Sequence, residues 1–216
     1  MKNAIMVISF MVMIALLSIS TGCSKGSSPT EPAEQDTTDP GPVVRKPNIY
    51  IYPQIKSIVT VNLDFPQGGT VIESIPTYTG GWRVEVTPSG RIDNQYDYLF
   101  YECRVPDAYQ YEAGWIVCID SLELFFRSNL EQAGFINTEI EDFVSYWIPR
   151  LTDHSDYIIY PQFSKDIEKV IKLNIHKIPD NILRLFYVIK GHQDSVINLT
   201  EPVIPEFDRS GFVVTE

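Results

Sequence analysis

The stretch that decides the fold is GWIVCIDSLELFFRSNLEQAG, residues 114–134, because the spacing of its apolar residues changes partway along. It begins with a short apolar run, which is typical of a strand. From Leu122 onward, apolar residues recur at helical spacing until Gly134, a residue type that commonly ends helices. Asp120 and Glu123 have the spacing of an acidic capping box. We therefore predict a strand followed directly by an amphipathic helix.

A second amphipathic helix is predicted immediately after the first. Thr138 and Glu141 have the spacing of a capping box, and Pro149 marks the end of the helix. The apolar residues between them fall at i, i+3, i+4 and i+7: Ile140, Phe143, Val144 and Trp147. Each helix therefore has one apolar face to bury.

Strands are predicted on both sides of this helical pair. Before it, alternating segments such as SIVTVNLDF (57–65) and WRVEVT (82–87) indicate five or six short strands. After it, DYIIYP (156–161) and GFVVT (211–215) read as strands, and residues 170–190 read as a β-hairpin around Pro179-Asp180-Asn181. The order predicts an α+β domain with an antiparallel sheet or sandwich, since a parallel sheet would need helices between most strands.

The charge of the chain argues against one class of partner. The sequence has a formal net charge of −11 over 216 residues. Nucleic-acid binding usually begins with a basic face, so we expect no DNA or RNA partner.

The N-terminus resembles the lipobox region of bacterial lipoproteins. Lys2 precedes an apolar run, residues 4–17, which is shorter than the roughly 20 residues that span a bilayer as a helix. Small residues and then Cys23 follow, as at a site where the signal is removed and the cysteine is lipidated. The alternative is an ordinary secretory signal with an incidental cysteine. We expect residues 1–22 to be a lipoprotein signal peptide and Cys23 to carry lipid, including palmitate, which would anchor the protein to a membrane.

Residues 23–45 are expected to be a disordered linker between the lipidated cysteine and a single domain, 46–216. The linker is rich in Ser, Thr, Pro, Gly and acids and lacks an apolar period, so it cannot bury enough surface to offset the entropy of ordering. The predicted location is the bacterial cell envelope, with the domain facing the periplasm or the exterior.

Several segments together resemble a family of uncharacterised bacterial secreted and lipid-anchored domains. That family opens with Lys-Pro-x-Ile-Tyr-Leu-Tyr-Pro and carries Tyr-Leu-Phe-Trp-Glu and Tyr-Trp-Leu-Pro motifs. The matching segments here are KPNIYIYP (46–53), GGWRVEVTPSGRI (80–92), YDYLFYE (96–102), FVSYWIPRL (143–151), LNIHKIPDNILRLFYV (173–188) and FDRSGFVVTE (207–216). Tyr101 stands where the family tends to have Trp. The resemblance implies an envelope location and a domain of unknown function.

Cys103 and Cys118 are a candidate disulfide. If the strands that contain them pair with each other, the two thiols face across a loop, and an oxidising exterior permits a bond. Two buried free thiols are the alternative. Three scattered histidines without ligand spacing, His154, His176 and His192, lead us to expect no metal, and we expect no cofactor.

Glu102 is a weak catalytic candidate, because it ends an aromatic run in a predicted strand. If its carboxylate points inward it needs a cation, since an unpaired buried charge is costly. Three arginines are candidates for that ion pair: Arg83, Arg104 and Arg184. In the alternative, a catalytic Glu102 acts on a glycan with a second carboxylate. The candidates for the second carboxylate are Glu73, Glu85 and Asp97.

Aromatic residues suggest a second kind of site. Tyr and Trp rings stack on the apolar faces of sugars, and their polar groups bond hydroxyls. The candidates for such contacts are Tyr98, Tyr101, Tyr109 and Trp115. Alternate positions of one strand point to opposite faces, so some of these rings belong to the core. The sequence favours a non-catalytic envelope module that binds a glycan, a peptide or an envelope protein; the alternative is a cell-envelope or polysaccharide glycoside hydrolase with paired carboxylates.

Overall fold

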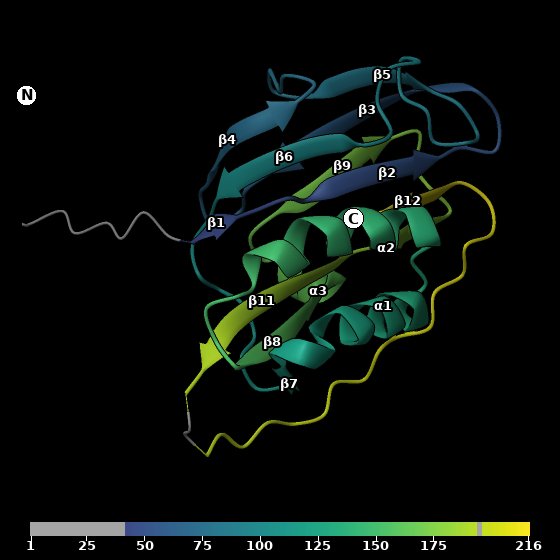
Figure 1. Ribbon diagram of the computed structural model, residues 1–216. Helices are drawn as coiled ribbons and strands as arrows, with labels where there is room; N and C mark the ends of the chain where they lie inside the picture. Colours follow the sequence, from purple (N-terminus) through teal and green to yellow (C-terminus); the bar gives the residue numbers. More distant parts are fainter. Residues whose placement is uncertain (1–41, 194–195) are drawn as a thin grey trace, which may run out of the picture. The chain divides into compact units, whose positions relative to one another are not determined.

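The computed structural model describes residues 42–193 and 196–216, which belong to one compact unit, Thr38–Glu216. The mixed α+β class is confirmed (Figure 1): the strands form three mostly antiparallel sheets, and two consecutive helices separate the groups of strands. The expected signal peptide, Cys23 and most of the expected linker lie outside the described residues.

The largest sheet has six strands. Its members are β1 (Val43–Val44), β2 (Asn48–Tyr52), β4 (Thr70–Ile75), β6 (Leu99–Arg104), β10 (Asn181–Leu183) and β12 (Val213–Thr215). β4 pairs with one edge of β6, and β1 and β2 pair with the other. β12, from the end of the printed sequence, lies between β2, to which it is antiparallel, and β10, to which it is parallel. β1 falls inside the expected linker, so the fold begins earlier than the predicted boundary at residue 46.

A second sheet completes the first hydrophobic core. It has the order β5 (Trp82–Val86), β3 (Ser57–Asp64), β9 (Lys172–His176). The predicted alternation of buried and exposed side chains in β3 is confirmed, because Val59 and Val61 are buried while Asp64 is exposed. These side chains pack with the inward residues of the six-stranded sheet, such as Ile49, Leu99 and Tyr101.

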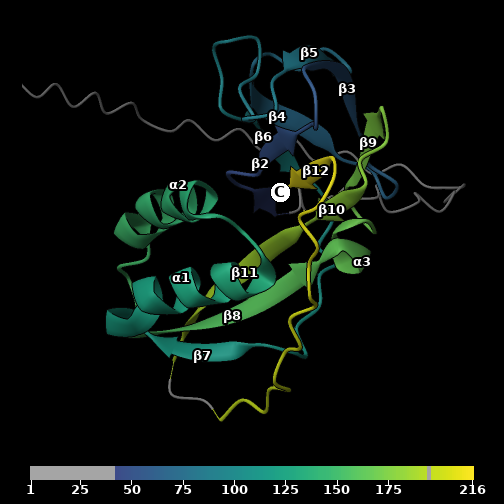
Figure 2. The same cartoon turned by 90° about the vertical axis from the view of Figure 1, so that its right-hand side faces the viewer.

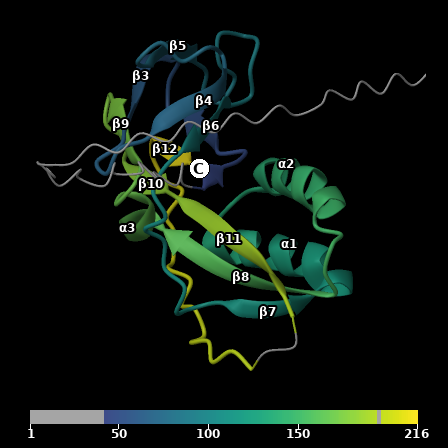
Figure 3. The ribbon, with the colours of Figure 1, turned by 90° about the vertical axis from the view of Figure 1, so that its left-hand side faces the viewer.

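The third sheet and the helices build the second core. The sheet has the order β11 (Leu185–His192), β8 (Asp156–Phe163), β7 (Trp115–Cys118). In Figures 2 and 3, which view the domain from opposite sides, α1 (Leu122–Ala133) lies along one face of it and α2 (Asn137–Trp147) packs beside α1. The apolar stripes of both helices are buried there, together with Val117, Ile159 and Leu185. A short helix, α3 (Ser164–Ile167), follows β8.

The predicted C-terminal end of α1 is confirmed, whereas the predicted N-terminal capping boxes of both helices are wrong. Gly134 adopts a left-handed φ of 105° and ends α1, as predicted. Neither predicted capping box forms: a 3₁₀ turn precedes α1, and at α2 the side chain of Glu139 accepts a hydrogen bond from the backbone N–H of Ile136. Glu141 instead pairs with Arg127.

The predicted hairpin around residues 179–181 is wrong. β9 pairs with β3, β10 pairs with β12, and β11 pairs with β8. The alternation of apolar residues located the strands correctly, but alternation alone does not name a partner strand. Among the described residues, no helix is long and apolar enough to cross a membrane.

Candidate functional site

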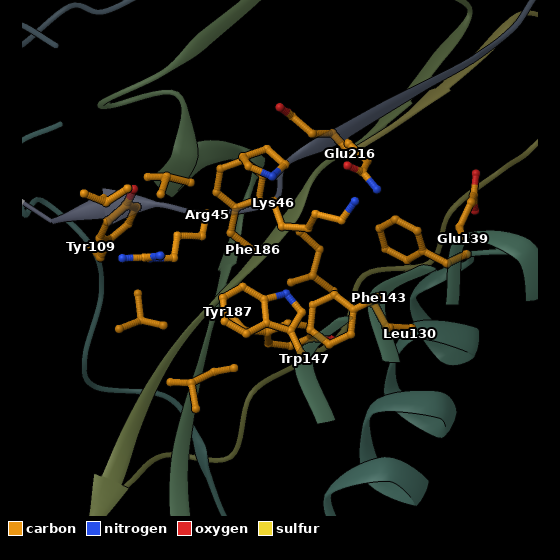
Figure 4. Close-up of a pocket in the computed structure, with 18 of the residues that line it drawn as sticks. Arg45, Lys46, Tyr109, Leu130, Glu139, Phe143, Trp147, Phe186, Tyr187 and Glu216 are labelled. Atoms are coloured by element: carbon orange, nitrogen blue, oxygen red, sulfur yellow. The ribbon is translucent and has the colours of Figure 1, made fainter. Parts of the chain in front are cut away.

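A cavity in the described structure lies along the edge of β11 that faces away from β8. Its volume is about 320 Å³. Three parts of the fold enclose it: the helices α1 and α2, residues 42–48 around β1, and the loop that carries Tyr109 and Tyr111. Figure 4 shows how side chains from these separate segments surround one space. A cavity of this size is in the range of small-molecule sites.

Aromatic rings form most of the wall. α2 contributes Phe143 and Trp147, which share a face because they are four residues apart. β11 contributes Tyr187, whose ring contacts Phe143 edge-on at 5.6 Å between centroids. The hydroxyl of Tyr187 donates to Asn129 over 2.6 Å, and burial raises its pKa far above the ordinary value. Tyr187 is therefore held as a neutral, fixed ring.

The two carboxylates that line the cavity already have partners. Glu139 is buried and pairs with Arg209 over 3.0 Å. Glu216 is buried and pairs with Arg184 over 2.5 Å. Burial by itself lowers the pKa of Arg184, but the attraction of the Glu216 carboxylate outweighs it and holds that pKa above its ordinary value. Both acids are therefore neutralised by fixed cations.

Lys46 also lines the cavity, and no acidic side chain of the described residues forms an ion pair with it. Lys46, between β1 and β2, donates to the hydroxyl of Tyr98 over 3.1 Å. Its ammonium also lies 4.9 to 5.5 Å from the centroids of three rings, those of Tyr98, Phe100 and Tyr146. Cation–π contacts of this kind stabilise the charge without neutralising it.

Polar atoms without partners also face this region. Asn48 is 8% exposed; its amide donates to the hydroxyl of Tyr50, but its Oδ1 atom has no hydrogen-bond partner among the described residues. The hydroxyl of Tyr109 has none either, and burial raises its pKa above the ordinary value. Buried polar atoms in native proteins nearly always have partners. Both of these atoms are enclosed by protein in the structure, so a ligand would reach them only after a neighbouring side chain shifts.

The loop that carries Tyr109 is held by two glutamines. The buried side chain of Gln162 accepts from the backbone N–H of Gln110 over 2.8 Å and donates to the backbone carbonyl of the same residue over 2.9 Å. In return, the side chain of Gln110 donates to the carbonyl of Pro161 over 2.7 Å. This exchange imitates strand pairing and fixes one wall of the cavity.

The four candidate aromatic residues do not form one surface. Tyr109 lines the cavity, and Tyr98 contacts Lys46 at its side. Tyr101 is fully buried in the first core, where it donates to Glu216 over 2.6 Å. Trp115 is half-buried on β7 and packs edge-on against Phe125. Only two of the four therefore lie near the same space.

The two cysteines of the domain are free. Cys103 is fully buried in β6, and Cys118 is exposed at the end of β7, in another sheet. The strand pairing that a disulfide would require does not occur; the alternative of two free thiols is found, but only Cys103 is buried. The apolar runs looked complementary, but β6 pairs with β1, β2 and β4 instead.

Glu102 lies on the half-exposed face of β6, and none of the described arginines forms an ion pair with it. The expected buried ion pair is therefore not present. Its direct neighbour across the strands is Glu73 on β4. Neither residue lines the cavity beside β11, but Glu73 lines another hollow, formed by residues of β3, β4 and the loop after β4. In the described ranges, no group of three His, Cys, Asp or Glu side chains is arranged to hold a metal ion.

Sequence reasoning missed Lys46, Asn48 and most of the wall residues as site residues. Phe143 and Trp147 were visible only as a helix face. Comparisons of the chain with protein-family models, with curated proteins and with solved structures found no match.

Proposed function

We propose that this protein is a non-catalytic binding module of the bacterial cell envelope, held at a membrane by lipid on Cys23, and that it takes its ligand in the cavity beside β11. The observation that carries the proposal is the cavity itself. It combines an apolar, largely aromatic wall with a few polar atoms that have no partner, which is the usual composition of a ligand site.

The lining supports binding rather than catalysis. A hydrolase of the paired-carboxylate type needs one acid that can give up a proton and another that stays charged near the scissile bond. Here the lining carboxylates, Glu139 and Glu216, are each bound by a buried or half-buried arginine. Glu102 and Glu73 lie outside the lining, so we keep the glycoside hydrolase as the second candidate only.

The part of a ligand that enters would be flat or chain-like and largely apolar. Such a part belongs to a sugar ring, to the side chain of a peptide, or to a small amphiphile. An envelope glycan, peptide or protein is thus the proposed class of partner.

The test uses N-phenyl-1-naphthylamine, an uncharged aromatic dye that fluoresces when it leaves water. We expect saturable binding to the wild-type protein at one site. Val188 lines the cavity and is half-buried, so Val188→Trp fills the space and should abolish the signal. Val203 is 84% exposed and does not line the cavity, so Val203→Trp is the matched control and should bind as the wild type does.

Two results would count against the proposal. One is a wild-type protein that does not bind the dye. The other is a Val188→Trp variant that folds, as shown by near-ultraviolet circular dichroism, and still binds it. Envelope glycan fragments and peptides are then screened for displacement of the dye, which identifies the natural ligand class.

A further inference from the structure

We propose that the cavity selects ligands that carry one negative charge on an apolar or aromatic body, and that Lys46 is the residue that binds the charge. The inference rests on the proposed function and narrows it. It concerns the ligand class, an organic monoanion such as a carboxylate with a hydrophobic tail.

In the described part of the chain, the lining of the cavity has more unpaired positive than negative side chains. The chain has a net charge of −11, so an acidic neighbour is the common situation for a cation. At the cavity, however, the lining acids are already paired with the cations Arg184 and Arg209 and are not available to another cation. Within the described residues, Arg45 and Lys46 line the cavity without forming an ion pair. The charge that remains for a ligand is therefore positive.

The ammonium of Lys46 uses only some of its hydrogen-bond donors. An ammonium has three donors, and the hydrogen bond to Tyr98 uses one of them. The carboxylate of Asp142 accepts from Tyr50 over 2.8 Å, and no ion pair joins it to Lys46 among the described residues. No other acceptor among the described residues takes a hydrogen bond from this ammonium, which leaves two donors for an anion. The surrounding aromatic rings make a charge-assisted bond stronger there than in water.

The backbone at Lys46 has an uncommon conformation. Lys46 has a left-handed φ of 60°, and the next residue is Pro47, which normally requires an extended conformation before it. L-residues adopt this region at a cost, and such conformations gather at functional positions. Here the conformation lets the side chain reach from the β1–β2 connection to Tyr146 on α2 (Figure 4 shows the lysine within the cavity wall).

Asn48 adds a requirement next to the charge. Its Oδ1 atom is an acceptor that no described residue satisfies, and because protein encloses it, a donor from the ligand reaches it only after a side chain shifts. Because Asn48 and Lys46 are two residues apart and both contact the Tyr50–Tyr98 ring pair, the acceptor and the ammonium lie at the same end of the cavity. A ligand with an N–H or O–H beside its anionic group therefore fits best.

The test compares two dyes that differ in charge alone. 1-Anilinonaphthalene-8-sulfonate has the aromatic body and the N–H of N-phenyl-1-naphthylamine, plus one sulfonate. We expect the wild-type protein to bind the anionic dye about tenfold more tightly or better, since a hydrogen bond to a charged group is stronger than one between neutral groups. Added salt should weaken the binding of the anionic dye and leave that of the neutral dye nearly unchanged.

Lys46→Gln should remove this preference, so that both dyes bind with the affinity of the neutral one. Lys172 is exposed on β9 and does not line the cavity, so Lys172→Gln is the matched control and should keep the preference. Near-ultraviolet circular dichroism confirms that each variant is folded, because unfolded chains bind the anionic dye without specificity. N-acyl amino acids should displace the anionic dye at about tenfold lower concentration than their methyl esters.

The outcomes separate the two proposals. If both dyes bind equally to the wild-type protein, or if Lys46→Gln keeps the preference, the selection of anions is refuted while the binding cavity stands. If neither dye binds, or if filling the cavity at Val188 has no effect, the proposed function itself fails.

Discussion

The Nη1 atom of Arg209 lies 3.0 Å from the Oε2 atom of Glu139, and this ion pair ties together the two halves of the domain. The same carboxylate, in the first turn of α2, accepts hydrogen bonds from Tyr52 on β2 and Thr215 on β12. Arg209 also donates to the carbonyl of Gly134, after the end of α1. One buried carboxylate therefore fixes α2 against the six-stranded sheet, and with it one wall of the cavity.

Glu139→Gln should lower the free energy of unfolding by about 2–4 kcal/mol, because it leaves Arg209 without its partner and removes charge-assisted bonds in a buried place. The measurement is urea unfolding followed by circular dichroism. Glu141→Gln, on the same helix, is the matched control: Glu141 pairs with Arg127 at the surface, so its loss should be much smaller. Equal losses in the two variants would contradict this role for Glu139.

Stability should fall above about pH 9, in part because of Cys103. Burial, with a smaller contribution from Glu216, raises the pKa of this thiol from its ordinary value of 9.0 to about 12. The folded state therefore keeps the proton that the unfolded chain releases, so the stabilisation is complete below pH 9 and is lost as the pH rises toward 12. The burial-raised pKa of Tyr101 acts in the same direction.

Removing the thiol should therefore flatten this dependence. Between pH 9.5 and 11, Cys103→Ala should reduce the slope of the unfolding free energy by up to about 1.4 kcal/mol per pH unit. Cys118→Ala is the matched control, because an exposed thiol meets water in both the folded and the unfolded chain. Unfolding curves in urea at a series of pH values measure the slopes; identical slopes for wild type and Cys103→Ala would rule the effect out.

Gln162→Ala should loosen the cavity wall that carries Tyr109. The substitution leaves the backbone N–H and carbonyl of Gln110 without partners, at a cost of about 2–3 kcal/mol. Dye affinity should fall, and hydrogen exchange should accelerate at residues 108–113. The exposed Gln132 on α1 provides the control, since Gln132→Ala removes no buried contact. Unchanged exchange in the Gln162 variant would show that this loop is held by other contacts.

Lys46→Gly should be more stable than Lys46→Ala by about 1 kcal/mol, the reverse of the usual order. The backbone there has a φ of 60°, which glycine adopts freely and alanine does not. Both variants lack the ammonium, so both should bind the two dyes with equal affinity. Thermal unfolding of the pair decides the first point, and an alanine variant as stable as the glycine variant would argue against a left-handed backbone at this position.

Cys23→Ala should release the protein from membranes. When the gene is expressed in a bacterium that lipidates exported proteins, the wild-type protein should partition with the membrane fraction and take up labelled palmitate, whereas the variant should do neither. A variant that still partitions with membranes, or a wild-type protein that takes up no label, would overturn the proposed anchor.

The sequence by itself determined the class of the fold. The change from alternating to helical spacing after residue 120 reflects the local geometry of strand and helix, which each segment carries in its own residues. For the same reason Gly134 ended α1 as predicted. The positions of most strands followed from their alternation, including the last one, 213–215.

Only the tertiary structure decided which strands pair and which residues form the cavity. The strands that contain Cys103 and Cys118 look complementary, but they belong to different sheets because pairing depends on contacts far apart in the chain. Lys46 and Trp147 are about a hundred residues apart, yet both line the same space. The spacing of residues within one segment determines which of them share a face of a helix or strand. A cavity forms where such faces from distant segments meet, and the spacing within one segment does not specify which segments meet.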